Sequence, residues 1–289
     1  MVVATFNYFE LLDVHEGQKV KKKKKPKTKK KKVYPFEDAF HSLVFPAHDT
    51  FDGWRKVFFT TNEHGANTTL LKMTTNRLRG NTLIGVSGLF NLDLLAACLE
   101  QESKLPDGKL RHLIILDVNE SVIQFWKRIL EDLTACVTRS EFYMKLIRTI
   151  GNYSAMNATA SAYGFLSSNE TYDRVRNFCL QPAIEVEGGI MVPTVTVLRF
   201  DFSVPTAIST LSQTMEKCAM STAVLYWSNV PEYIPNLAEI IVLMKSKNHL
   251  LSNSKSWVID SDTVGPSRRH TQRLYRAKQL TIEKGWIQF

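Results

Sequence analysis

The stretch that most constrains the fold of this chain is residues 81–100, NTLIGVSGLFNLDLLAACLE. An apolar run of strand length, residues 82–86, leads into the small-residue turn Ser87-Gly88, and a helix is expected over about residues 92–99. Parallel α/β sheets use a strand, a tight turn and a helix in this order to bring backbone N–H groups up to a ligand. We therefore expect the rest of the chain to be organised around this unit.

A second apolar run, residues 113–116, ends in an acid, Asp117. If the two runs form neighbouring parallel strands, Gly88 and Asp117 meet at the carboxyl edge of the sheet. A nucleoside-like cofactor would bind at that edge.

The alternation of strands and helices continues after these two units. Further strands are expected over residues 192–200, which lead into Asp201-Phe202, over 223–227, which lead into Ser228, and over 256–259. Helices are expected over residues 120–134, 205–219 and 236–245, and a hairpin signal follows at 279–282 and 286–289. This pattern predicts an α/β fold with a Rossmann-like, mostly parallel sheet, helices on both faces and a C-terminal antiparallel hairpin.

Composition shifts divide the sequence into three parts. Residues 1–33 are expected to be a disordered, lysine-rich N-terminal arm, and residues 34–80, rich in aromatic residues, an N-terminal helical cap. Residues 81–289 are expected to form the α/β domain, with an insertion at about 141–187 that interrupts the alternation.

The formal net charge of +9 comes from one segment, residues 19–32, in which eleven of fourteen positions are lysine. Subtracting eleven charges from +9 leaves about −2 for the remaining residues, so no basic face is expected on the folded domain. Like-charge repulsion and Pro26 prevent the segment from packing. Two readings stay open: a solvated linker, or an arm that binds a polyanion such as nucleic acid or contacts an import receptor.

The four cysteines, Cys98, Cys136, Cys179 and Cys218, are far apart and form no CxxC pair. We expect buried, reduced thiols and no metal site. The N-terminal residues contain acids and lack a long apolar core, and no apolar run is long enough to span a membrane. A soluble intracellular protein is expected, nuclear if the lysine run is an import signal and cytoplasmic otherwise.

The order of these pieces over residues 81–289 resembles a class I S-adenosylmethionine-dependent methyltransferase. The resemblance implies that the turn residues Gly85, Ser87 and Gly88 approach the methionine part of S-adenosylmethionine. It implies that Asp117 binds the ribose hydroxyls, since a carboxylate can accept from two vicinal hydroxyls.

The ends of the later strands extend this resemblance. Asp201 and Phe202 would hold the adenine, because an exocyclic amine needs an acceptor beside an apolar surface. Ser228 and the residues after it would face the transferred methyl group, with Asn229 and Tyr233 as catalytic residues beside the acceptor. The insertion at 141–187 would also border the acceptor.

The sequence also departs from the family pattern. The first motif has two glycines and lacks the acid that usually precedes a richer glycine pattern. The run NVPEY that begins at Asn229 is similar to the Asn-Pro-Pro-Tyr motif of base methyltransferases, but its aromatic residue is displaced by one position, so base methylation does not follow.

The expected function is an S-adenosylmethionine-dependent methyltransferase with an unknown acceptor. Two alternatives stay open: an aminocarboxypropyl transferase that uses the same cofactor, and a catalytically inactive, methyltransferase-like interaction module. A dehydrogenase is disfavoured because the G-x-G-x-x-G pattern is absent. Strand-end acids are also common as helix caps, which is the structural explanation of Asp117 and Asp201.

Overall fold

The computed structural model describes residues 34–35, 59, 61, 63–102, 109–151, 161–186, 190–228, 230, 247, 250–251, 255–264 and 269–277. The lysine run at 19–32, the helix expected at 236–245, the C-terminal hairpin and the predicted catalytic pair Asn229 and Tyr233 all lie outside these residues.

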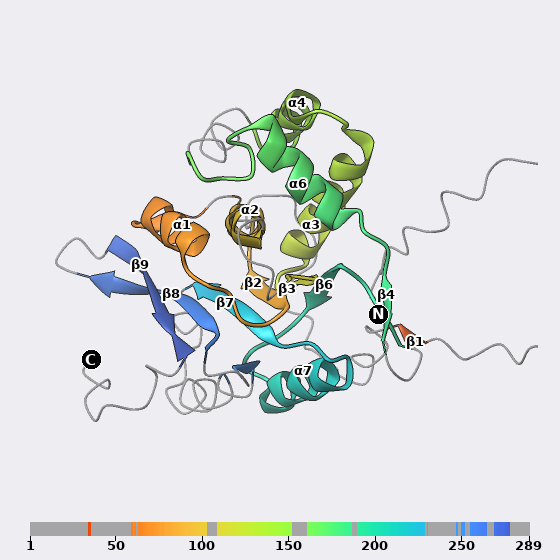
Figure 1. The fold of residues 1–289 in the computed structure, drawn as a ribbon, viewed down its shortest axis with the longest axis vertical. Coiled ribbons are helices and arrows are strands. Elements are labelled where there is room, and N and C mark those ends of the chain that lie inside the picture. Colours follow the sequence, from red (N-terminus) through yellow and green to blue (C-terminus); the bar gives the residue numbers. More distant parts are fainter. Residues whose placement is uncertain are drawn as a thin grey trace, which may run out of the picture.

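A six-stranded sheet forms the centre of the molecule, in the order β6-β3-β2-β7-β8-β9 (Figure 1). Neighbouring strands are parallel except for the last pair, β8 and β9, which is antiparallel. The strands are β2 (Thr82–Val86), β3 (His112–Asp117), β6 (Val195–Arg199), β7 (Thr222–Ser228), β8 (Trp257–Val264) and β9 (Arg269–Arg276). The predicted fold class, a Rossmann-like α/β fold with an antiparallel C-terminal pair, is therefore confirmed.

Helices cover both faces of this sheet, as Figure 1 shows. On one face lie α1 (Ala66–Thr75), α2 (Phe90–Glu102) and α3 (Glu120–Ala135), and on the other lies α7 (Pro205–Lys217). Continuous apolar runs in β2, β3 and β7 are needed because these strands are buried on both faces. Each face of the sheet accordingly carries its own cluster of buried apolar side chains.

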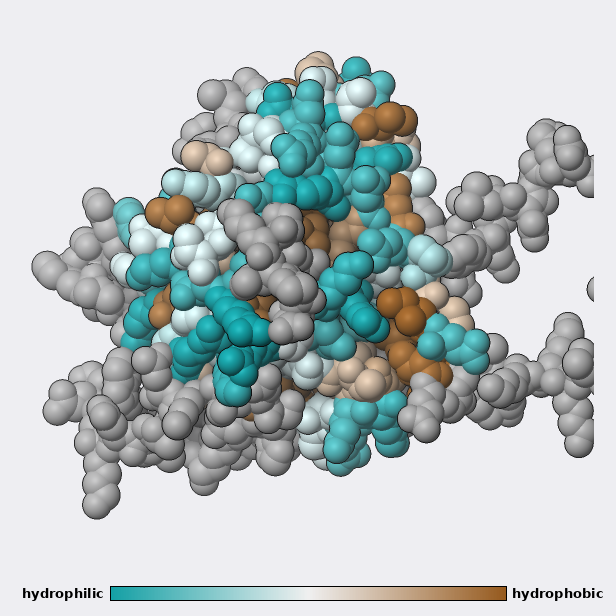
Figure 2. All heavy atoms as spheres, in the orientation of Figure 1, coloured by the Kyte–Doolittle hydropathy of each residue, from teal (hydrophilic) through white to brown (hydrophobic). Residues whose placement is uncertain are grey.

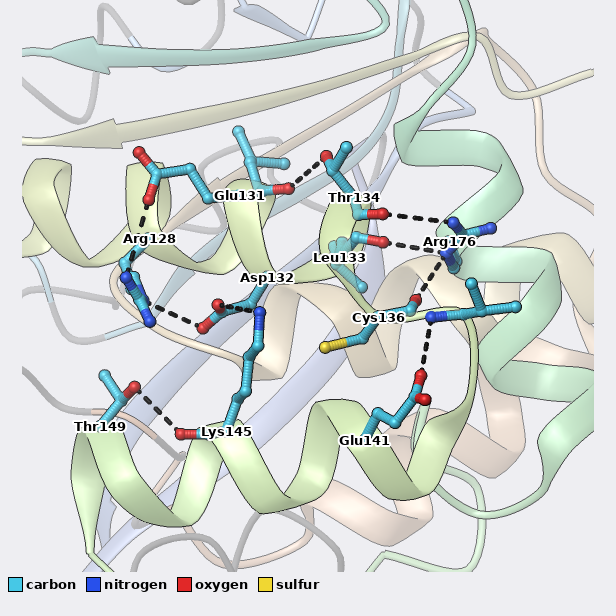
Figure 3. Close-up of polar contacts among 12 residues, drawn as sticks. Arg128, Glu131, Asp132, Leu133, Thr134, Cys136, Glu141, Lys145, Thr149 and Arg176 are labelled. Carbon is cyan, nitrogen blue, oxygen red and sulfur yellow. Dashed lines mark hydrogen bonds and ion pairs between the residues drawn. The ribbon is translucent and has the colours of Figure 1, made fainter.

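The insertion attaches to the rest of the domain through α2 and α3. Its helices, α4 (Arg139–Ile150) and α6 (Asn169–Cys179), pack against α3 and against each other. Figure 3 shows the polar part of this contact: Lys145 pairs with the buried Asp132 at 3.4 Å, and Arg176 donates to the carbonyl oxygen of Cys136 at 2.8 Å. Arg176 thereby satisfies carbonyl groups at the end of α3 that have no partner within the helix.

A second, smaller sheet has the order β1-β5-β4 and lies beside β6. Its strands are β1 (Tyr34–Pro35), β5 (Ile190–Val192) and β4 (Ile184–Val186). The single strand expected over residues 192–200 is wrong, because β5 and β6 are separate strands with Pro193 between them. Proline has no N–H group to donate to a ladder, which favours a break at that position.

The antiparallel partner of β8 was not predicted from the sequence. β9 follows β8 directly and pairs with it from Trp257 opposite Arg276 to Val264 opposite Arg269. Its sequence, RHTQRLYR, contains no apolar run, as is common for strands at the edge of a sheet.

The described surface in Figure 2 is mostly hydrophilic, with hydrophobic residues in separate patches. All four cysteines are buried and free, as expected. Among the helices in the described part of the chain, none is long and apolar enough to cross a membrane. The described residues also contain no group of three or more His, Cys, Asp or Glu side chains that could hold a metal ion.

Candidate functional site

The strand order reverses between β2 and β7. The chain passes outward from β2 through β3 and β6 on one side, and from β7 through β8 and β9 on the other. Open α/β sheets bind ligands outside the carboxyl ends of their strands at such a reversal. The end of β2, the end of β7 and the neighbouring end of β3 therefore define the candidate site.

Two serines with unusual backbone geometry lie at the reversal. The parallel pairing of β2 with β7 extends to Ile84 and Leu225, and Ser87 and Ser228 each stand three residues further along these neighbouring strands. Their φ angles are +64° and +51°, in the left-handed region that residues other than glycine rarely occupy. Such strain costs on the order of 1 kcal/mol per residue and gathers at functional sites.

The backbone of Ser87 is fixed from two directions. Its N–H group donates to Asp117 Oδ2 at 3.2 Å, and its carbonyl oxygen accepts from Trp126 Nε1 at 2.6 Å. The other oxygen of the same carboxylate, Asp117 Oδ1, accepts from the N–H of Asn119 at 2.9 Å. Asp117 thus joins the ends of β2 and β3, and its carboxylate keeps capacity to accept a further hydrogen bond.

Burial raises the pKa of Asp117 to about 6, although hydrogen bonds from the backbone of Asn119, Ser87 and Val118 act in the opposite direction. A carboxyl group with this pKa exchanges its proton near neutral pH. Perturbed pKa values of this kind are more frequent at functional sites than elsewhere, although structural networks also produce them.

The glycine in β2 is explained by packing within the turn. A Cβ atom on Gly85 would lie 1.7 Å from Oδ1 of the fully buried Asn91. The Asn91 amide nitrogen donates to the carbonyl oxygens of Val86 at 2.8 Å and Gly88 at 2.9 Å, so it holds the turn closed. Gly85 therefore makes room for Asn91, which sequence reasoning did not single out.

Asp201 and Phe202 come to the same edge of the sheet as Asp117. The N–H of Phe200 donates to the carbonyl oxygen of Asp117 at 2.8 Å, and Asp201 follows directly. Asp201 Oδ1 accepts from the N–H and the hydroxyl of Ser203, at 2.8 and 2.7 Å, so one of its roles is to order the turn before α7.

The ring of Phe202 lies between two other aromatic rings, at 4.9 Å from Phe200 and 5.9 Å from Trp227. The ammonium group of Lys247 lies over the ring of Trp227, 4.7 Å from the ring centroid. Lys247 is buried, and this burial lowers its pKa to about 8 despite the opposing charge of Asp260.

A buried acid, Glu63, lies at the end of β7. Its Oε1 accepts from the hydroxyl of Ser228, and its Oε2 accepts from Gln272 Nε2 at 2.7 Å, Thr61 Oγ1 at 3.1 Å and the Tyr226 hydroxyl at 3.4 Å. The segment that carries Glu63 also covers the turn after β2, because the carbonyl oxygen of Phe59 accepts from the N–H of Leu89 at 2.8 Å.

The structure thus places the predicted cofactor residues Gly85, Ser87, Gly88, Asp117, Asp201, Phe202 and Ser228 at or next to the carboxyl ends of four adjacent strands. Their assignment to a cofactor stays a prediction. The same holds for the predicted catalytic residues Asn229 and Tyr233, which the described part of the chain does not include.

Sequence reasoning missed Glu63, Asn91 and Trp126. Trp126 lies in the helix expected over residues 120–134 and is buried, and its indole N–H also holds the turn after β2. Glu63 lies in the segment expected to be an N-terminal helical cap, and its partners on β7 and β9 are 163 to 209 residues away in the sequence.

No family model matches this chain, and no curated protein sequence matches it. A solved structure of the rRNA methyltransferase aviRa from Streptomyces viridochromogenes aligns over 83% of this chain and 92% of its own, with 13% sequence identity and a TM-score of 0.39. A likeness this distant decides nothing about the activity of this chain, so the site rests on its own geometry.

Proposed function

We propose that this chain binds S-adenosylmethionine at the carboxyl edge formed by β2, β3, β6 and β7 and transfers a methyl group from it. The observation that carries the proposal is the convergence of Ser87, Asp117 and Ser228 at the reversal of the strand order. A nucleoside ligand is favoured because a carboxylate at the end of the second parallel strand suits vicinal hydroxyls.

The residues present fit this cofactor. Asp117 accepts from the backbone N–H groups of Ser87, Val118 and Asn119, and since a carboxylate has four lone pairs it can still accept from a ribose hydroxyl. Phe202 offers an apolar surface beside Asp201, as an adenine ring requires. When bound, S-adenosylmethionine supplies a methyl group on a positively charged sulfonium, so the protein has mainly to orient the acceptor.

The test is calorimetric titration of the full chain with S-adenosylmethionine, in the wild type and in Asp117→Ala. Loss of the hydrogen bonds of a charged group to the ribose should weaken binding by about tenfold to a hundredfold. Asp132→Asn is the control, because Asp132 is a buried acid about three turns along α3 from this edge. Undiminished affinity in a folded Asp117→Ala variant, or no binding by the wild type, would contradict the proposal.

The products separate the reactions that share this cofactor. Methyl transfer releases S-adenosylhomocysteine, whereas aminocarboxypropyl transfer releases methylthioadenosine. Incubation with cell extract followed by mass spectrometry of the small molecules therefore distinguishes these two reactions. Binding with neither product formed would favour an inactive interaction module.

A further inference from the structure

The group of polar side chains around Glu63 has the character of a site for a cation. Glu63 is buried, and each of its four neighbours donates a hydrogen bond to it. Burial, and after it the negative charge of Glu63, raise the pKa of Tyr226 far above its usual value, so this hydroxyl stays protonated and donates. The group therefore surrounds a carboxylate with hydrogen-bond donors.

The four donors are shared unequally between the two carboxylate oxygens. Three of them reach Oε2, and Ser228 reaches Oε1. A carboxylate oxygen has two lone pairs, so Oε1 can accept one more hydrogen bond. Ser228 ends β7, and Oε1 is therefore the oxygen of Glu63 that lies next to the strand end.

Two further buried acceptors, one of them on a direct partner of Glu63, have no partner among the described residues. They are Gln272 Oε1, on the side chain that donates to Glu63, and Ser261 Oγ, whose residue pairs with Gln272 across β8 and β9. Both atoms are buried. Buried polar atoms are nearly always hydrogen-bonded, so these two indicate a polar group that joins the protein here.

An ammonium group matches these requirements. It carries a positive charge for Glu63 and three N–H donors for acceptors such as Glu63 Oε1, Gln272 Oε1 and Ser261 Oγ. A sulfonium has charge but no N–H donor, and an additional anion would be repelled by Glu63. β2 and the turn after it contain no acid that could perform this role.

We propose that Glu63, Gln272 and Ser261 form the subsite for the ammonium group at the amino-acid end of S-adenosylmethionine. This assignment rests on the proposed function, since it presumes that the nucleoside end lies against Asp117. It adds a binding residue, Glu63, that comes from outside the strand–turn–helix unit and its neighbours. The segment before α1 then takes part in binding the cofactor.

The experiment compares three probes by calorimetry: S-adenosylmethionine, S-adenosylhomocysteine and 5′-methylthioadenosine. The first two carry the ammonium group, and methylthioadenosine lacks the whole amino-acid end. In Glu63→Gln, affinity for the first two should fall by about tenfold or more, because a charged hydrogen bond is lost. Affinity for methylthioadenosine should change by less than about twofold. Asp132→Asn, which removes a buried charge far from the edge, should leave all three affinities unchanged.

Ser261→Ala provides a second variant that does not depend on how well Glu63→Gln folds. Its hydroxyl has no partner among the described residues, so removing it should leave thermal stability unchanged. Its affinity for S-adenosylhomocysteine should nevertheless fall by about threefold, and its affinity for methylthioadenosine should stay unchanged.

The pattern across probes decides the outcome. Equal losses for all three probes, a loss confined to S-adenosylmethionine, or no loss in either variant would overturn the ammonium subsite while leaving cofactor binding intact. Failure of the wild type to bind any of the three would overturn the proposed function and this subsite together.

Discussion

The ends of β2 and β7 lie side by side and have the same unusual backbone geometry, yet they are held in different ways. Ser87, after β2, is fixed through its backbone by Asp117 and Trp126. Ser228, at the end of β7, reaches Glu63 through its side chain. The first strand end is fastened within the unit formed by β2, β3 and α3, whereas the second depends on a segment from far away in the sequence.

Under the proposed function, this difference separates a scaffold from a binding surface. Around Ser87 the hydrogen bonds stay within one unit: the Asn91 amide nitrogen bonds to the carbonyl oxygens of the turn, Gly85 leaves room for Asn91, and Asn91 Oδ1 has no partner among the described residues. Around Ser228 the contacts lead to a buried acid with two partnerless acceptors beside it, as far as the described residues show. A turn that is fixed internally keeps its shape without ligand, and a strand end with unmet acceptors gains by binding one.

Of the substitutions considered, Gly85→Ala should lower the free energy of unfolding the most, because it disrupts the turn after β2. The new methyl group would lie 1.7 Å from Asn91 Oδ1, so the turn or the helix after it must shift. Overpacking of a buried site typically costs about 1–3 kcal/mol, and we expect the upper end of that range or more, because both groups are fully buried. Urea unfolding monitored by circular dichroism measures the loss.

A double variant shows whether Asn91 is the cause. Asn91→Ala alone should destabilise the protein because it removes the hydrogen bonds to Val86 and Gly88. If Asn91 is what excludes a side chain at position 85, adding Gly85→Ala to Asn91→Ala should cost much less than Gly85→Ala does in the wild type. Full additivity of the two losses would show that some other contact requires the glycine.

The pH dependence of stability tests the role of Asp117, and its effect on the free energy of unfolding should be smaller than that of Gly85→Ala. Its pKa is about 6 in the folded protein and about 3.9 in an unfolded chain. The folded state therefore holds this proton over a pH range in which the unfolded state has lost it, so this group's contribution to stability falls as the pH rises from about 4 to above 6. The loss over this range is about 3 kcal/mol, since one pKa unit corresponds to about 1.4 kcal/mol.

The variant Asp117→Asn isolates this contribution. The decline in the free energy of unfolding between pH 4.5 and pH 7.5 should become shallower in the variant, as measured by urea titration at both pH values. Asp93 is the matched comparison, since burial raises its pKa to about 7 and its Oδ1 accepts from the N–H of Phe165 in the insertion. An unchanged slope in Asp117→Asn would show that Asp117 is ionised in the native turn throughout this range.

The sequence predicted the scaffold well because its signals are local. Apolar runs of strand length, an acid after residues 113–116 and small residues at Ser87-Gly88 follow directly from neighbouring positions, and they produced the correct order of β2, α2, β3 and α3. β9 could not be predicted in this way, because its alternating polar residues resemble a loop.

Glu63 could not be predicted from local pattern at all. Its significance comes from Ser228 and Gln272, which reach it only once β7 and β9 have been placed in the sheet. A lone glutamate in a polar segment looks the same in the sequence whether it is exposed or buried. The residues whose role depends on contacts between distant strands are therefore the ones that required the structure.

The smallest effect concerns glycine substitution at the two serines, and here the comparison predicts different outcomes for the same change. Glycine relieves left-handed strain but increases the entropy of the unfolded chain, and each effect amounts to about 0.5–1 kcal/mol. Ser87→Gly keeps the backbone hydrogen bonds to Asp117 and Trp126, so it should cost less than the matching change at Ser228. Ser228→Gly also loses the bond to Glu63 and should cost about 1.5 kcal/mol. If the two variants lower the thermal unfolding midpoint equally, the hydrogen bond from the Ser228 side chain to Glu63 does not add to stability. The two strand ends would then be held alike.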